Sequence, residues 1–189
     1  MDILTLGWAV GAFGLFYLYD WCTVRRPDSA FLRVGFWAGC LLALAATLRT
    51  ALQALPRPAK ALFWGMPALL FAFLLAHALF FSLPEETYRN PGARRRVWDR
   101  KMYALCRHPG FLWFAGLYIC LGGAFGPGSW PCFFLLCLLN LVYIWMQDRW
   151  TFPKTFCDYE EYRRRVPFLL PTPGSLKTCL RQYAGRKEG

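Results

Sequence analysis

Residues 111–146 read FLWFAGLYICLGGAFGPGSWPCFFLLCLLNLVYIWM, and the interpretation of this chain starts from them. They contain two apolar runs, Phe111–Phe125 and Trp130–Met146, which are separated by the uncharged sequence Gly126-Pro127-Gly128-Ser129. Glycine and proline in such a junction end one helix and allow a turn into the next. We therefore expect a tight helical hairpin whose two arms each cross a bilayer, although a typical span takes about 20 residues.

Three further apolar runs precede the hairpin, and each is long enough to span a membrane. They are Ile3–Tyr19, Phe31–Leu48 and Ala61–Leu83. Hydrophobic residues make up 57% of the 189-residue chain and charged residues 17%, whereas soluble domains have about 45–50% and about 25%. The composition excludes a disordered chain and predicts an all-α integral membrane protein with five transmembrane helices.

The distribution of basic residues predicts how these helices are oriented. The chain has 22 lysines and arginines against 11 acids, a net charge of +11. With five spans, the first loop, the third loop and the C-terminal segment share one side and carry nineteen of the 22 basic residues. By the positive-inside bias we expect a multi-pass protein with its N-terminus outside and its C-terminus in the cytoplasm. The basic loops then face anionic lipid headgroups, and nucleic acid is not the expected partner.

The cysteines and histidines do not form a metal-binding pattern. None of the eight cysteines forms a CxxC pair, and the chain has only two histidines, His77 and His108. A structural zinc site would need more ligands at the usual spacing. We therefore predict free thiols and no metal, and we leave His77, within the third span, outside the expected site.

Two polar segments flank the hairpin, Tyr88–Gly110 before it and Gln147–Pro173 after it. A hairpin returns the chain to the same membrane face, so we expect these segments to meet there. The first contains Arg107-His108-Pro109. Arginine and histidine can bind an anionic group at a helix N-terminus, and proline is favoured at the first helical position. A pair that only sets the topology explains this motif equally well.

The second segment begins with a candidate acid. Asp148 lies at the end of an apolar run, where a carboxylate is costly unless it faces water or a partner. Farther along, Glu160, Glu161 and Arg163–Arg165 form a charge run. We interpret that run as the solvated, headgroup-binding face of a short amphipathic helix, not as a catalytic group.

Taken together, these motifs resemble the isoprenylcysteine carboxyl methyltransferase and phospholipid methyltransferase family of membrane enzymes. The similarity covers about residues 98–173 and depends on the order and spacing of the motifs around the hairpin. It is carried by Arg107-His108-Pro109, Asp148, Phe156, Tyr159, Tyr162, Val166 and Pro167. The chain departs from the family's usual pattern at Phe111, Gln147 and Cys157.

The resemblance implies an enzyme that transfers a methyl group from S-adenosylmethionine to a lipid, a lipidated group or another apolar acceptor at the cytoplasmic face. It implies catalytic roles for Arg107, His108 and Asp148. The cofactor-binding set that it implies is Tyr103, Arg107, His108, Pro109, Gly110, Asp148, Tyr159 and Tyr162. The reaction would be an in-line displacement at the sulfonium methyl, helped by alignment and by exclusion of water.

These expectations divide the chain into three parts. Residues 1–83 supply three N-terminal spans, residues 84–173 form the methyltransferase core, and residues 174–189 form a basic tail. Two other interpretations stay open: a sterol-reductase-like membrane enzyme that uses NADPH, and a non-catalytic membrane scaffold.

Overall fold

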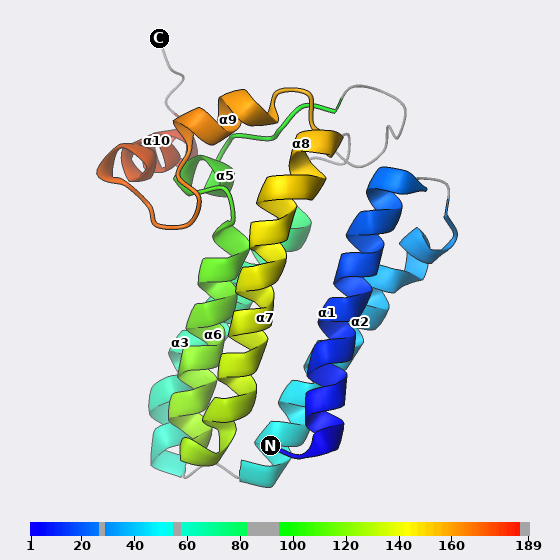
Figure 1. Cartoon of the computed structure of the whole chain (residues 1–189). Helices are drawn as coiled ribbons and strands as arrows, with labels where there is room; N and C mark the ends of the chain where they lie inside the picture. Colours follow the sequence, from blue (N-terminus) through cyan, green and yellow to red (C-terminus); the bar gives the residue numbers. More distant parts are fainter. Residues whose placement is uncertain (27–28, 55–57, 83–94, 186–189) are drawn as a thin grey trace.

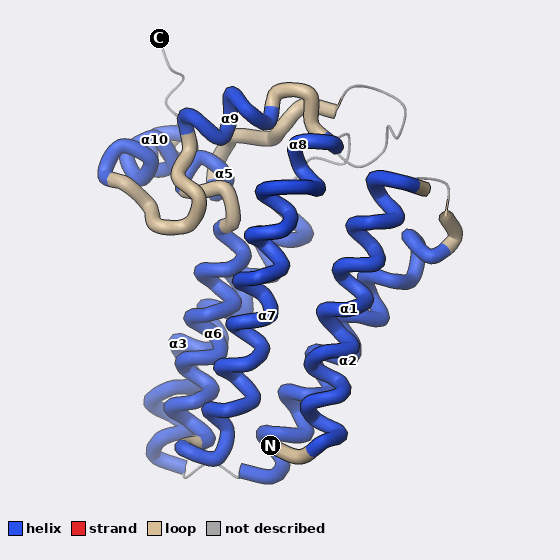
Figure 2. The backbone as a smooth tube through the Cα atoms, viewed as in Figure 1, coloured by secondary structure: helices blue, strands red, loops and turns tan. Residues whose placement is uncertain are grey.

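The computed structural model describes residues 1–26, 29–54, 58–82 and 95–185. Within these ranges the chain is all-helical, as predicted, and contains no strand (Figure 2). The long helices run side by side in an up-and-down bundle (Figure 1). They are α1 (Ile3–Arg25), α2 (Phe31–Ala54), α3 (Pro58–Ala76), α6 (Pro109–Phe125) and α7 (Trp130–Met146).

Short elements lie at the two ends of this bundle. At one end, which we call the polar end, α7 continues into the remaining C-terminal helices (Figure 1). The elements there are α5 (Met102–Leu105), η3 (Gln147–Thr151), α8 (Phe152–Thr155), α9 (Tyr159–Arg165) and α10 (Pro173–Tyr183). At the opposite end, the hairpin end, the short turn η2 (Pro127–Ser129) joins α6 to α7 near the N-terminus.

Among the residues that the structure describes, four helices are long and apolar enough to cross a membrane: Ile3–Arg25, Val34–Ala54, Ala59–Phe81 and Pro127–Thr155. The third of these continues α3 through the π-helical turn η1 (His77–Phe81), and the fourth continues α7 through η3 and α8. The helix Pro109–Phe125 is apolar but shorter. Large apolar side chains such as Leu52, Leu62 and Leu69 are about three-quarters exposed on this bundle. Such a surface suits lipid tails and not water, so the chain has the character of a membrane protein.

The interior of the bundle is held by aromatic side chains against small residues. Phe13, Phe133 and Leu136 are almost fully buried between α1 and α7. On α6, a Cβ at Gly116 would lie 2.6 Å from the Phe71 ring, and a Cβ at Gly123 would lie 2.5 Å from the Trp64 ring. Glycine at these two positions therefore lets α3 approach α6 closely.

The two polar segments fold against each other at the polar end. The hydrogen bonds that join them include Arg107 N to Pro167 O (2.9 Å), Tyr162 Oη to Tyr103 O (2.8 Å), Val97 N to Asp158 Oδ1 (2.8 Å) and Cys157 N to Arg95 O (2.9 Å). Much of the segment expected as a basic tail forms α10, which packs on α5 through Cys179, Ala104 and Leu105. The start of the first polar segment, residues 88–94, lies outside the described residues.

Candidate functional site

Asp148 is the centre of a buried polar cluster at the polar end. Its side chain follows α7 directly, in the first turn of η3, and the residue is 3% exposed. Its Oδ1 accepts a hydrogen bond of 2.6 Å from the Tyr159 hydroxyl, and its Oδ2 accepts one of 3.3 Å from Arg107 Nη2. Arg163 Nε lies 3.9 Å from Oδ2. We call Arg107, His108, Asp148, Tyr159 and Arg163 the Asp148 cluster.

Arg107 brings a buried positive charge to this carboxylate. Its Nε lies 2.9 Å from Asp148 Oδ1, although the N–H is not aligned for a hydrogen bond. Its Nη1 donates to the backbone carbonyl of Arg163 at 2.8 Å, and its guanidinium lies 5.5 Å from the Phe168 ring centroid. A buried ion is tolerated only when it is paired and hydrogen-bonded, and Arg107 meets both conditions.

His108 lies beside this ion pair as the N-cap of α6. Its ring stacks on Phe152 at 5.7 Å and meets the edge of Phe168 at 5.1 Å. Its Nε2 is 3.6 Å from Asp148 Oδ1, too far for a hydrogen bond, and this buried atom has no hydrogen-bond partner among the described residues. Burial lowers the pKa of His108 below its ordinary value, so the ring is neutral at pH 7.

Two tyrosines from α9 close the cluster on the side of the second polar segment. Tyr159 and Tyr162 are both almost fully buried. Burial and the Asp148 carboxylate raise the pKa of Tyr159 well above its ordinary value, so this phenol stays a neutral donor. Tyr162 donates instead to the backbone carbonyl of Tyr103 and holds the two polar segments together.

The cluster contains more positive than negative charge. Arg107 and Arg163 face the single carboxylate of Asp148 while His108 is neutral. Glu160 lies 3.5 Å from Arg163, but its side chain is 65% exposed and its charge is screened by water. The indole Nε1 atoms of Trp98 and Trp113 are also buried donors without a partner among the described residues. The polar end can therefore accept an anionic or hydrogen-bonding group.

The remaining sequence-predicted residues surround this cluster at different distances. Pro109 is buried at the first position of α6. The Tyr103 hydroxyl donates to the Ala78 carbonyl of η1 at 3.1 Å, so it points toward the bundle. The open side of Gly110 faces Leu79, 3.7 Å from the position of a Cβ, and so faces η1 and not Asp148. Arg107, His108, Asp148 and Tyr159 are thus the predicted residues that the structure brings into one cluster.

Sequence reasoning missed two polar residues of this region. Asp20 on α1 is 4% exposed, and the Thr151 hydroxyl of η3 donates to it at 3.3 Å. It also lies at the end of an apolar run, so the argument that selects Asp148 also applies to it. Arg163 was expected on a solvated face, yet its side chain is only 31% exposed and approaches Asp148.

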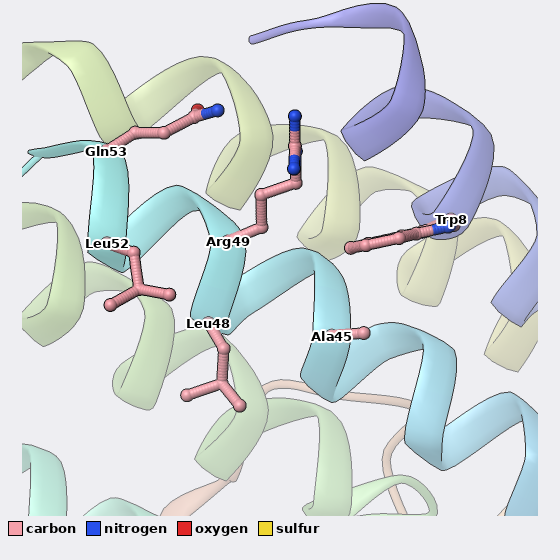
Figure 3. Close-up of a pocket in the computed structure, with 6 residues that line it drawn as sticks. All are labelled: Trp8, Ala45, Leu48, Arg49, Leu52 and Gln53. Carbon is pink, nitrogen blue, oxygen red and sulfur yellow. The ribbon is translucent and has the colours of Figure 1, made fainter.

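Two pockets open away from the Asp148 cluster. One, of about 350 Å³, lies toward the hairpin end and is lined by Trp8 of α1 and by Ala45, Leu48, Arg49, Leu52 and Gln53 of α2 (Figure 3). Its arginine is already engaged, because Arg49 Nη2 lies 2.7 Å from Asp2 Oδ2. The other, of about 430 Å³, lies between α1 and η3 and is lined by Tyr17, Leu18, Trp21, Met146 and Trp150.

His77 and the thiols show no comparable cluster in the part of the chain that the structure describes. His77 Nδ1 is 2.9 Å from the Ser82 hydroxyl, a local partner. Burial raises the pKa of the Cys106 thiol to about 12, so this cysteine is unreactive at pH 7. No group of three or more histidine, cysteine or acidic side chains among the described residues is arranged to hold a metal ion.

Comparison of the chain with protein-family models, with curated proteins and with solved structures finds no match. The interpretation of the site therefore depends on its own geometry and chemistry.

Proposed function

We propose that this chain is an integral membrane methyltransferase that transfers the methyl group of S-adenosylmethionine to a lipid, lipidated or otherwise apolar acceptor. One observation carries the proposal: Arg107 and His108, before the hairpin, meet Asp148 in one buried cluster, although Asp148 follows the hairpin and lies 41 residues after Arg107. This cluster lies where apolar helices end and the polar segments begin (Figure 1). A lipophilic acceptor and a charged cosubstrate can approach such a position from opposite sides.

The bundle supports five crossings with the polar end in the cytoplasm. The 17 residues of α6 rise about 26 Å, close to the apolar thickness of a bilayer. α6 runs antiparallel to α7 and only residues 126–129 separate the two helices, so we expect α6 to cross the membrane together with α7. The excess of basic residues at the polar end then favours the cytoplasmic side for that end and the outside for the N-terminus.

The chemistry of the cluster fits the cofactor's charged groups. The guanidinium of Arg107 suits the carboxylate of the methionine part, and the Asp148 carboxylate suits its ammonium group or a ribose hydroxyl. The unpartnered Nε2 of His108 offers a buried polar atom to a bound group. Tyr159 would exchange its hydrogen bond to Asp148 for one to the cofactor.

When bound, S-adenosylmethionine supplies an electrophilic methyl group on a sulfonium sulfur. The chain's own contribution is to align the acceptor and to exclude water, and the burial of the cluster serves both purposes. A carboxylate or thiolate acceptor needs no base. An ammonium acceptor must first lose a proton, and a neutral histidine such as His108 can accept one.

A binding experiment tests this proposal directly. S-adenosylhomocysteine, titrated onto the purified protein, should raise the melting temperature, because a ligand at 100 times its dissociation constant adds about 2.7 kcal/mol of stability. His108→Ala and Asp148→Ala should each weaken binding at least tenfold, while Asp99→Asn, an acid paired with Arg165 outside the cluster, should not.

The other results are equally informative. Equal affinity in the wild type and in both cluster variants would remove the site assignment. Stabilisation by NADPH in place of S-adenosylhomocysteine would favour the reductase-like enzyme, and no shift with either compound would favour a scaffold.

A further inference from the structure

The pocket between α1 and η3 is an apolar groove that the proposed reaction does not use. It is lined by Tyr17, Leu18 and Trp21 from α1 and by Met146 and Trp150 from the end of α7 and η3. We call it the α1–η3 groove. Asp148 lies between Met146 and Trp150 in sequence but contacts Arg107 and Tyr159 instead. The groove is therefore on another side of this helix from the Asp148 cluster.

Two cations lie at the rim of this groove, each against one of its tryptophans. The Arg26 guanidinium is 5.9 Å from the Trp21 ring centroid, and Lys154 Nζ is 4.5 Å from the Trp150 ring centroid. Both side chains are exposed, and neither forms an ion pair with any of the described residues. The groove thus combines an apolar body with a positively charged rim at the polar end of the bundle.

This combination matches the chemistry of an amphiphile with a negative head. The groove lies on α1 and on the helix that continues α7, both of which are long and apolar enough to cross a membrane. An acyl chain can cover its aromatic and aliphatic side chains, and a phosphate can pair with the cations at its rim. Tryptophan is amphipathic, so its ring suits the acyl chain while its indole N–H can donate a hydrogen bond to a phosphate oxygen.

We propose that the α1–η3 groove binds one anionic glycerophospholipid, with an acyl chain along Leu18 and Met146 and with the headgroup held between Arg26 and Lys154. A zwitterionic lipid brings its own ammonium group to the same rim and loses much of this attraction. The proposal requires only that the bundle lies in a membrane, and it stands whether or not the chain transfers methyl groups.

A lipid titration followed by native mass spectrometry tests the groove. The delipidated protein in detergent is titrated with phosphatidylglycerol and, separately, with phosphatidylcholine of the same acyl chains. Each cation at a membrane surface contributes about fivefold in affinity, so we expect phosphatidylglycerol to bind about 25-fold more tightly. The double variant Arg26→Gln with Lys154→Gln should bind both lipids equally.

Matched variants separate this site from general electrostatic attraction. Lys177→Gln with Arg181→Gln removes the same two charges from exposed positions of α10 and should keep the full preference for phosphatidylglycerol. Leu18→Trp fills the groove and should lower the affinity for both lipids at least fivefold. Circular dichroism would show that the bundle of this variant is intact.

Three outcomes would overturn the proposal. Equal binding of the two lipids by the wild type would show that the rim does not select charge. If the Lys177→Gln, Arg181→Gln variant lost the preference for phosphatidylglycerol as fully as the Arg26→Gln, Lys154→Gln variant, the attraction would be diffuse. Unchanged lipid binding by Leu18→Trp would show that the lipid binds outside the groove.

Discussion

Replacing Asp148 by asparagine removes the buried carboxylate while keeping the shape of its side chain. Asp148 is 3% exposed and Arg107 is 9% exposed, so the guanidinium would be left without its countercharge in a mostly buried position. Breaking a buried ion pair in this way costs about 3–5 kcal/mol. For a chain of this length each kcal/mol shifts the melting temperature by about 2–4 °C, so we expect Asp148→Asn to lower it by about 6–20 °C.

Thermal unfolding followed by circular dichroism in detergent measures this effect. Glu160→Gln is the matched control, because it removes one negative charge from an ion pair with Arg163 in which the Glu160 side chain is 65% exposed. Such an exposed pair contributes at most about 1 kcal/mol, so this variant should melt within about 4 °C of the wild type.

A double variant separates the ion pair from the site's general sensitivity to substitution. Arg107→Met with Asp148→Leu removes both charges and should recover much of the loss seen in Asp148→Asn. Two results would refute the role of the ion pair. Asp148→Asn could melt at the same temperature as Glu160→Gln, or the loss of stability in the double variant could equal the sum of the losses in its two single variants.

Three further predictions concern proton uptake, helix packing and orientation. Lowering the pH from 7 to 5 should lower the melting temperature of the wild type more than that of His108→Asn. The reason is that His108 takes up a proton at about pH 6.5 in the unfolded state and only at a lower pH in the folded state. An equal change of melting temperature with pH in the two proteins would contradict a buried neutral ring. Gly123→Ala should lower the stability by about 1–3 kcal/mol, because its Cβ would lie 2.5 Å from the Trp64 ring. Gly14→Ala, whose Cβ would have nothing within 4 Å, should be neutral or stabilising by up to about 1 kcal/mol. Equal shifts of the melting temperature in the two variants would contradict the packing of α3 on α6. In sealed vesicles of known orientation, a variant that keeps only the exposed Cys157 should react with a membrane-impermeant maleimide from the cytoplasmic face; reaction from the outer face alone would reverse the proposed topology.

The bounds of the helical hairpin are well predicted by local sequence signals. The expected arms, Phe111–Phe125 and Trp130–Met146, differ from α6 and α7 only in that α6 begins at Pro109. Proline at a first helical position and a Gly-Pro turn are local signals that act within a few residues. The ends of the other spans were less well predicted, and α1 continues through Asp20 to Arg25 instead of ending at Tyr19.

That longer α1 explains why Asp20 was missed. A polar residue usually marks the end of an apolar run, but here the helix continues past it and the Thr151 hydroxyl of η3 satisfies the carboxylate. The partner is 131 residues away in sequence, so no local pattern indicates it. Arg163 was misplaced for a similar reason, since its neighbours form a solvated charge run while its own side chain approaches Asp148.

The sequence alone determined the helical class, the hairpin and the set of polar residues next to it, because hydrophobic length and turn chemistry act over short distances. Only the tertiary structure decided which of those polar residues meet. The hairpin brings Arg107 to Asp148, α9 adds Tyr159, and the open side of Gly110 faces Leu79 of η1 instead. Those contacts depend on how whole helices rotate and approach one another, and the packing of side chains distant in sequence sets that arrangement.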